Sequence, residues 1–293
     1  MKKILVLSIL LHGCCLLGQA SAQFANAVVD YTPGALFDSY NTPTSALGQP
    51  APIVGPDSGF PGVFSPFDPH YETTDLVGIG AGGQLTLQLQ NFVNVQSGAF
   101  EIGVWSNVGL TDVDYPNGTA GNPVTTFSPP SSAVVSVSAD GTHWVTLNGG
   151  SPITFSLPGN YYTNAGPFDP TAPADPQFAN FGQPFTGSLS DFDGEDYAQV
   201  LATLDGSAGG TWLDLDGTGL SQVGYVRFNG VADGDELYIN GVGINSSLAG
   251  AEVVPEPASA GLLLLGAVSA LAWRRNRKGV LNVRESVPPV WPL

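Results

Sequence analysis

Two acidic phrases in this chain could bind a metal ion. One surrounds Gly194, and the other is the Asp-x-Asp-Gly phrase at residues 214–217. Calcium takes about six to eight oxygen ligands, and carboxylates spaced along a glycine-bent loop can converge on it. The first phrase has a second interpretation, in which Asp193 caps a helix and its first turn favours acidic residues. The predicted calcium ligands are Asp191, Asp193, Glu195, Asp196, Asp214 and Asp216.

Three tryptophans suggest a second kind of site, because an exposed indole ring can stack on the face of a sugar. Trp144 falls in a predicted hairpin, where a large aromatic side chain more often packs in the core. Trp212 lies between Gly210 and Asp214 in a predicted loop. Trp212 and Trp105 are therefore the candidate glycan-binding residues.

Residues that could carry out catalysis are scarce between residues 23 and 253. This range has no Cys and no Lys, and its two histidines, His70 and His143, are far apart in the sequence. It also lacks the Gly-x-Ser-x-Gly phrase of serine hydrolases. Paired carboxylates can hydrolyse a glycoside, so a glycoside-acting enzyme remains an alternative. We predict that the protein is not an enzyme.

The chain is strongly acidic, with 25 Asp and Glu against 8 Lys and Arg and a net charge of −17. Between residues 23 and 253 the only Lys or Arg is Arg227. Nucleic acid is excluded as a partner, because phosphate binding needs Lys and Arg to replace counterions. Anionic membrane surfaces are disfavoured for the same reason. Such a composition suits an exterior where dissolved cations screen the repulsion.

The N-terminus has the organisation of a secretory signal. Lys2 and Lys3 are followed by an apolar stretch at residues 4–17 and by small residues that include Ala20 and Ala22. The export machinery reads this combination. We predict a signal peptide at residues 1–22, which signal peptidase cleaves after Ala22 so that the mature chain begins at Gln23. Lipidation of Cys14 is the alternative, although His12 stands where a lipoprotein signal prefers a small residue.

Both cysteines, Cys14 and Cys15, lie inside this predicted signal. The exported part of the chain would therefore have no disulfide bond. A single domain of this length can be stable through core burial alone.

A second apolar segment covers residues 258–273 and is followed by a basic cluster at residues 274–278. As a helix it would reach about 24 Å, short of the hydrocarbon core of a bilayer at about 30 Å. The positive-inside rule keeps the basic cluster cytoplasmic and leaves the residues before Ala258 outside. The segment can halt transfer through the inner membrane, but it is a marginal permanent anchor.

Val254-Pro255-Glu256-Pro257 stands directly before this segment. Pro-Glu-Pro, a short helix rich in Gly, Ala and Leu, and an Arg-rich end together closely resemble the PEP-CTERM sorting signal. The resemblance implies that exosortase, a membrane protease-transpeptidase, recognises residues 254–278 as a partner enzyme. The implied sorting residues are Val254, Pro255, Glu256, Pro257, Arg274, Arg275, Arg277 and Lys278.

One alternative stays open, and the chain departs from the family pattern at one point. An ordinary single-pass anchor with a proline hinge would also place prolines at a helix boundary. Members of the family usually stop soon after the basic cluster, whereas this chain continues through residues 279–293, which we predict to be a cytoplasmic tail.

The body at residues 23–253 reads as mostly β-strand. Leu85, Leu87 and Leu89 alternate with polar residues, which predicts a half-buried strand. Asp140-Gly141 between two β-prone runs predicts a hairpin. Tyr197, Val200, Leu201 and Leu204 have helical spacing, and Gly206 can end that helix. The other strands are predicted at residues 100–105, 133–138, 153–157, 223–228 and 237–242.

Two stretches rich in proline are predicted to be loops. Residues 32–70 form the first, and the second is a long insertion at about residues 162–192. Loops of such length are either functional or disordered. The insertion is predicted to pack on its own aromatic side chains, which are Phe168, Phe178, Phe181 and Phe185.

Blocks along the body resemble bacterial surface modules of the galactose-binding-like, discoidin-like jelly-roll type. The blocks lie at residues 46–48, 82–87, 135–144, 225–228 and 236–240. The resemblance implies an all-β fold with a single jelly-roll-type β-sandwich, one short helix and long loops. An immunoglobulin-like sandwich is the alternative.

The predicted function follows from the two ends and the body together. We expect an exported, non-enzymatic cell-surface or extracellular-matrix protein that is held in the membrane during sorting through its C-terminal signal. A glycan-binding module of the extracellular polysaccharide matrix is the alternative.

Overall fold

A computed structural model describes residues 23–36, 39–231 and 236–253 of the chain. The predicted signal peptide, sorting signal, apolar helix at 258–273 and cytoplasmic tail all lie outside the described residues. Among those described, no helix is both long and apolar enough to cross a membrane. The described part is mostly antiparallel β-structure with one α-helix, as the alternating sequence predicts.

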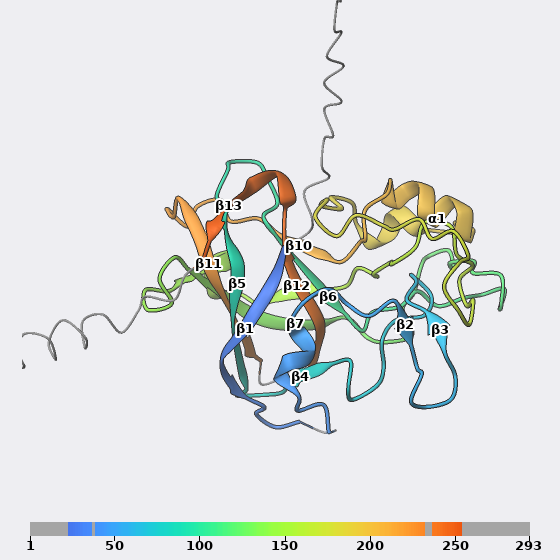
Figure 1. Ribbon diagram of the computed structural model, residues 1–293, viewed down its shortest axis with the longest axis horizontal. Coiled ribbons are helices and arrows are strands. Elements are labelled where there is room, and N and C mark those ends of the chain that lie inside the picture. The colour runs from blue at the N-terminus through green and yellow to red at the C-terminus, as the bar shows by residue number, and fades with distance from the viewer. Residues whose placement is uncertain (1–22, 37–38, 232–235, 254–293) are drawn as a thin grey trace, which may run out of the picture. The chain divides into compact units, whose positions relative to one another are not determined.

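The largest sheet has the strand order β10-β6-β12-β1-β5-β11-β7-β8, with β13 paired to β5, β4 to β12 and β9 to β7 (Figure 1). The strands are β1 Gln23–Thr32, β4 Val77–Ile79, β5 Gln84–Asn94, β6 Ile102–Ser106, β7 Ser131–Ser138, β8 Val145–Thr146, β9 Ile153–Phe155, β10 Thr211–Leu213, β11 Gln222–Gly230, β12 Leu237–Ile244 and β13 Ala249–Glu252. A separate pair consists of β2 Ile53–Val54 and β3 Gly62–Val63. The prediction of an all-β fold is consistent with this architecture, whereas the galactose-binding-like jelly roll stays a prediction.

Strand β1 links the two halves of the large sheet. Gln23 and Phe24 pair with β12, and from Ala25 onward the strand pairs with β5. Register shifts after Ala25 and Val28 bend the strand where it changes partner. The first hydrophobic cluster contains side chains from both halves, including Leu87 of β5 and Val242 of β12.

The middle of β5 is buried on both faces, which differs from the predicted half-buried strand. Leu85, Leu87 and Leu89 lie in the first cluster as expected. The alternate residues Thr86 and Gln88 are also buried. Arg227 of β11 bonds to Thr86 and Val253 bonds to Gln88, so these residues help to cover the second face. Alternation alone does not reveal such covering, because polar residues also face buried hydrogen-bond partners.

A second hydrophobic cluster is built from loops, the helix α1 and one face of β6 and β10. Figure 1 shows α1, β2 and β3 beside the large sheet. Phe181 and Phe185 of the predicted insertion are buried in this cluster, and Phe168 packs against it. Phe178 is exposed and lies outside this cluster, but its ring packs on Tyr161 and Tyr162. The buried rings also pack beyond their own loop, since Phe181 contacts Phe24 and Trp105.

Helix α1 covers Tyr197–Leu204 and buries Val200 and Leu204, as the spacing predicts. Its N-cap is Asp196, whose carboxylate accepts from the Gln199 N–H while the Gln199 side chain accepts from the Asp196 N–H. This capping box corrects the interpretation that Asp193 is the cap. The helix ends at Asp205, which adopts a left-handed conformation with φ 49°, just before Gly206.

The predicted hairpin is present between β7 and β8, where Val137 pairs with Val145. The Asp140 carboxylate accepts hydrogen bonds from the Thr142 and His143 N–H groups, and Gly141 has φ 75°. Trp144 then lies against the Arg227 guanidinium, which sits 3.8 Å from the centre of the indole ring. Arg227 also donates from Nε to the Thr86 hydroxyl and so helps to cover β5.

Candidate functional site

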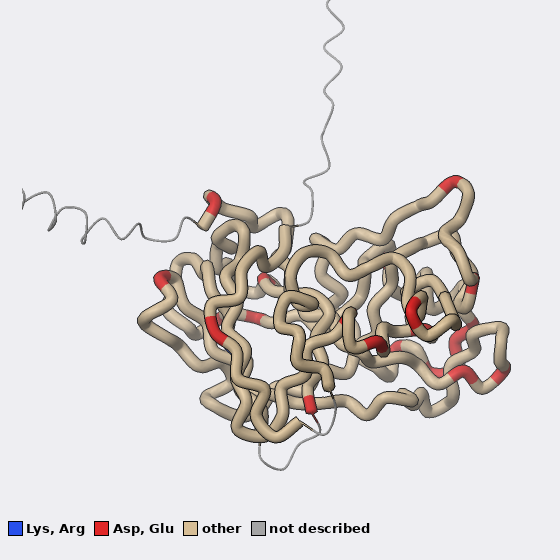
Figure 2. The backbone as a smooth tube through the Cα atoms, turned by 60° about the horizontal axis from the view of Figure 1, so that its bottom comes forward, with Lys and Arg blue, Asp and Glu red and all other residues tan. Residues whose placement is uncertain are grey.

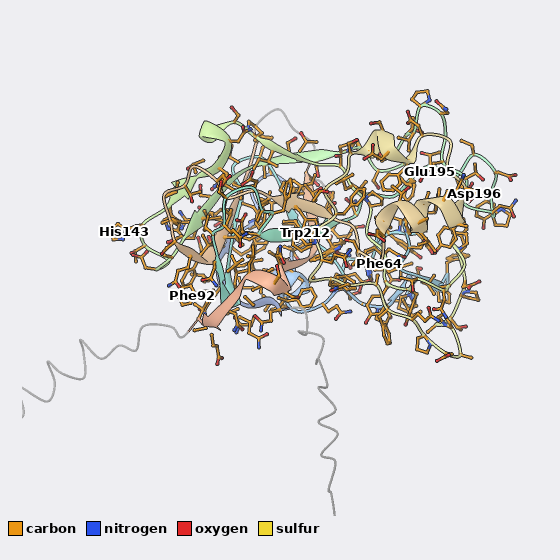
Figure 3. All side chains as sticks on the ribbon, turned by 90° about the horizontal axis from the view of Figure 1, so that it is seen from above. Phe64, Phe92, His143, Glu195, Asp196 and Trp212 are labelled. Carbon is orange, nitrogen blue, oxygen red and sulfur yellow. The ribbon has the colours of Figure 1, made fainter. Side chains whose placement is uncertain are left out.

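The four carboxylates of the first acidic phrase bind separate donors. Asp191 accepts from the Ser188 N–H at 2.8 Å, and Asp193 accepts from the Val124 N–H at 2.7 Å. Both carboxylate oxygens of Glu195 accept from the Thr203 hydroxyl, while Asp196 caps α1 (Figure 3). These carboxylates organise the turn before the helix.

The second acidic phrase joins two loops. Asp214 accepts from the N–H of Asp216, and Asp216 accepts from the Ser97 hydroxyl and the Gly98 N–H. In the part of the chain that the structure describes, no three or more His, Cys, Asp or Glu side chains gather so that they could hold a metal ion. Figure 2 shows the Asp and Glu residues at many places along the described backbone. Among the described residues these carboxylates are therefore not gathered into one group, and each accepts a hydrogen bond from the protein, while calcium binding stays a prediction.

If these carboxylates serve only to hold the loops, the melting temperature of the purified body should be insensitive to calcium. An ion that binds only the folded state must raise the free energy of unfolding, by RT ln(1 + [ion]/Kd). Melting curves measured with a chelator and with millimolar calcium should agree to about 1 °C, which corresponds to a few tenths of a kcal/mol for a domain of this size. A reproducible rise in melting temperature with calcium would contradict this assignment.

The two candidate glycan-binding tryptophans are buried. Trp105 is 0% exposed and Trp212 is 6% exposed. The Trp105 indole N–H donates to the carbonyl of Ala208, and that of Trp212 donates to the carbonyl of Gly209. Trp212 lies in β10 rather than in the predicted loop. Neither ring offers the open face that sugar stacking needs, so the prediction based on these residues is corrected to a role in packing.

The two tryptophans pack edge to face, with ring centres 5.8 Å apart at 82°. This close packing depends on Gly103 of β6, because a Cβ atom there would lie 2.8 Å from the Trp212 ring and 3.0 Å from the Trp105 ring. Figure 3 marks the position of Trp212 within the body. The pair therefore contributes to the packing between the sheet and the loops that cover it.

The two histidines lie in different surroundings. His70 is 1% exposed, and its two ring nitrogens lie 3.0 Å from a carboxylate oxygen of Asp75 and 3.0 Å from the Ala51 carbonyl oxygen. Its ring packs on Phe64. His143 is exposed and contacts the Asp140 carboxylate on the hairpin. Both imidazoles thus bind nearby acceptors that hold loops in place.

Asp68 lies close to His70 and is partly buried. Burial raises the pKa of Asp68 to about 6, and the nearby His70 partly opposes this rise by favouring the charged carboxylate. A carboxyl group whose folded-state pKa is raised favours folding when it is protonated. Its contribution to stability is full below its unfolded value of 3.8 and declines as the pH rises through about 6.

We expect Asp68→Asn to stabilise the body at pH 8 and to have little effect at pH 4. The gain at pH 8 should be on the order of 1–2 kcal/mol, since part of the pKa shift is offset by solvent screening. Urea unfolding at both pH values measures it. Asp57→Asn, which removes an exposed carboxylate from the same loop region, is the matched control and should change stability by less than about 0.5 kcal/mol at either pH. Equal effects of the two substitutions would contradict this assignment.

The C-terminal end of the described body is held on β5. Val253 is 2% exposed, its N–H donates to the Gln90 carbonyl, and its own carbonyl accepts from the Gln88 side-chain amide at 2.9 Å. Its side chain lies near Gly224, where an added Cβ atom would be 3.1 Å from Val253 Cγ2 and 2.8 Å from Phe92 Cε1. Phe92 is labelled in Figure 3. The chain is thus fixed to the sheet up to residue 253.

Comparison with protein families gives one match, and it begins at this residue. Residues 253–278 carry a PEP-CTERM protein-sorting motif. The matched range includes all eight sorting residues predicted from the sequence, from Val254 to Lys278, and it ends before the tail at 279–293. No curated protein matches the chain.

The motif indicates an exported protein that is sorted by exosortase, a membrane protease, and is anchored in the membrane during sorting. The sorting residues beyond Val253 lie outside the described residues. The sequence did not indicate that the Gln88 side chain holds Val253, the residue at which the motif begins. Gln88 belongs to the polar face of an alternating strand, and nothing in that pattern distinguishes it from Gln84 or Gln90.

Proposed function

We propose that the protein is a non-enzymatic component of the cell surface or extracellular matrix, which exosortase delivers through its C-terminal motif. The observation that carries this proposal is the PEP-CTERM motif that follows directly on a folded β-rich body. Signal peptidase would act at the other end, after Ala22. The strongly acidic composition supports a place in the exterior, where cations screen the charge.

The role without catalysis is supported by how the reactive groups are used. His70 is enclosed by Asp75, Ala51 and Phe64, and the carboxylates of both acidic phrases accept hydrogen bonds from nearby groups. Through these hydrogen bonds the imidazole and the carboxylates hold loop segments in place. Extracellular polysaccharide stays a further proposed partner, although the two tryptophans expected to bind it are buried.

Deleting residues 274–278 should prevent correct sorting. This deletion removes the basic cluster that would keep the C-terminus cytoplasmic while exosortase acts. In a host that contains exosortase, fractionation followed by immunoblotting should show a strong loss of the surface-delivered form. Deleting residues 279–293, which lie beyond the matched motif, is the control and should leave delivery unchanged. Normal surface delivery after loss of residues 274–278 would refute the proposal.

A further inference from the structure

Three amide side chains of β5 bind the backbone of β13 and of the residues directly before and after it. Gln88 Nε2 donates to the Val253 carbonyl at 2.9 Å, Asn91 Nδ2 to the Gly250 carbonyl at 2.8 Å, and Asn94 Nδ2 to the Leu248 carbonyl at 3.0 Å. We call this set, Gln88, Asn91 and Asn94, the amide clasp. It follows the departing chain for six positions, from residue 248 to the residue at which the sorting motif begins.

The clasp lies where regular strand pairing is weak. Strand β13 pairs with β5 at Ala249 and Glu252, and the register shifts between these two positions. An irregular ladder leaves backbone carbonyls without regular partners, and a buried carbonyl without a partner destabilises the fold. Side-chain amides can reach such carbonyls. The amide clasp therefore holds a segment that backbone pairing alone would hold poorly.

We infer that the amide clasp fixes the boundary between the body and the segment available to the sorting protease, so that the folded protein is cut only beyond Val253. A protease needs its substrate extended with free backbone groups, so a paired and buried segment is cut only when it opens locally. Val253 has both backbone groups bonded and its side chain enclosed. The Pro-Glu-Pro phrase begins two positions later. The part of this inference that concerns exosortase rests on the proposed function.

Glu252 provides a direct probe of the clasp without any host enzyme. It is exposed, it lies in β13, and a glutamate-specific endoprotease cuts after it only when the strand opens. We would measure the rate of that cut in the purified full chain by mass spectrometry. Gln88→Ala and Asn91→Ala should each raise the rate about two- to tenfold, the usual value of one hydrogen bond, and the double variant should exceed both.

Gln90→Ala is the matched control. It removes the same kind of side chain from the same strand, but the Gln90 side chain is exposed. Its cutting rate after Glu252 should equal that of the wild type. Thermal melting of each variant separates local opening from global unfolding, because only a variant that melts normally reports on the clasp. Equal rates in Gln88→Ala, Asn91→Ala, their double variant and Gln90→Ala, with normal melting throughout, would overturn the inference.

The consequence for sorting is tested in a host that contains exosortase. The wild-type protein should end beyond Val253, whereas the double variant Gln88→Ala/Asn91→Ala should also yield shorter species that end within residues 249–253. A wild-type C-terminus inside β13, or a double variant with only the wild-type terminus, would overturn this consequence. If exosortase leaves the wild-type chain uncut, the proposed function fails. The rate at which the glutamate-specific protease cuts after Glu252 still decides whether the amide clasp holds the strand.

Discussion

Replacing Trp105 with alanine should lower the free energy of unfolding of the body by about 3–5 kcal/mol, the usual cost of truncating a fully buried large aromatic residue. Trp105 is 0% exposed, and its ring contacts Phe24, Phe181 and Trp212. The truncation would leave a cavity between the sheet and the loops that cover it. It would also remove the donor to the Ala208 carbonyl, which would then lose this partner.

Urea unfolding of the wild type and the variant, followed by circular dichroism, measures this loss. Trp144→Ala is the control, because Trp144 is only partly buried and lies under the Arg227 guanidinium. Loss of such a partly exposed cation–π contact should cost about 1 kcal/mol. Similar losses in the two variants would show that Trp105 does not join the sheet to its covering loops.

Glu101→Ala should destabilise the body by about 2–4 kcal/mol. Glu101 is 0% exposed, and its two carboxylate oxygens accept from the N–H groups of Gln96 and Leu215. It joins the loop between β5 and β6 to the loop after β10, beside Asp214 and Asp216. Its removal would leave the buried Leu215 N–H and the partly buried Gln96 N–H without this acceptor, at a combined cost of about 2–4 kcal/mol.

Denaturant unfolding at several pH values tests this role. Glu252→Ala, which removes an exposed carboxylate, should change stability by less than about 0.5 kcal/mol. Burial raises the pKa of Glu101, with the nearby Asp214 and Asp216 adding to the rise and the two N–H donors opposing it. The protonated form therefore favours folding, so the advantage of the wild type over Glu101→Ala should decline as the pH rises above the ordinary glutamate value. An advantage that grows with pH would contradict this account.

The strands could be predicted from sequence because their apolar residues repeat with a period of two. Leu85, Leu87 and Leu89 show this directly, and the Asp140-Gly141 hairpin forms because its turn chemistry is local. The helix at residues 197–204 was also predictable from spacing. These features depend on short stretches of chain, so residue patterns within each stretch are enough to predict them.

The sites could not be predicted in the same way, because they depend on contacts between distant segments. Trp212 is buried through Gly103 and Trp105, which are more than a hundred positions away. Asp193 binds the N–H of Val124 instead of capping the nearby helix. Gln88 meets the carbonyl of Val253 although 165 positions separate them. No local pattern indicates such partners.

The sorting motif is predictable for a different reason. Export and sorting enzymes read short linear sequences, so the order of residues is itself the signal. Pro255, Glu256, Pro257 and the basic cluster at 274–278 therefore indicate the destination of the protein, while the fold of the body indicates how its boundary with that signal is held.

The most direct test of the account is the intact mass of the wild-type protein recovered from the surface or medium of a host that contains exosortase. The account predicts a chain that begins at Gln23, retains Val253 and lacks the apolar segment and basic cluster at residues 258–278. A recovered chain that still contains Arg274 to Lys278, or one that ends before Val253, would contradict it.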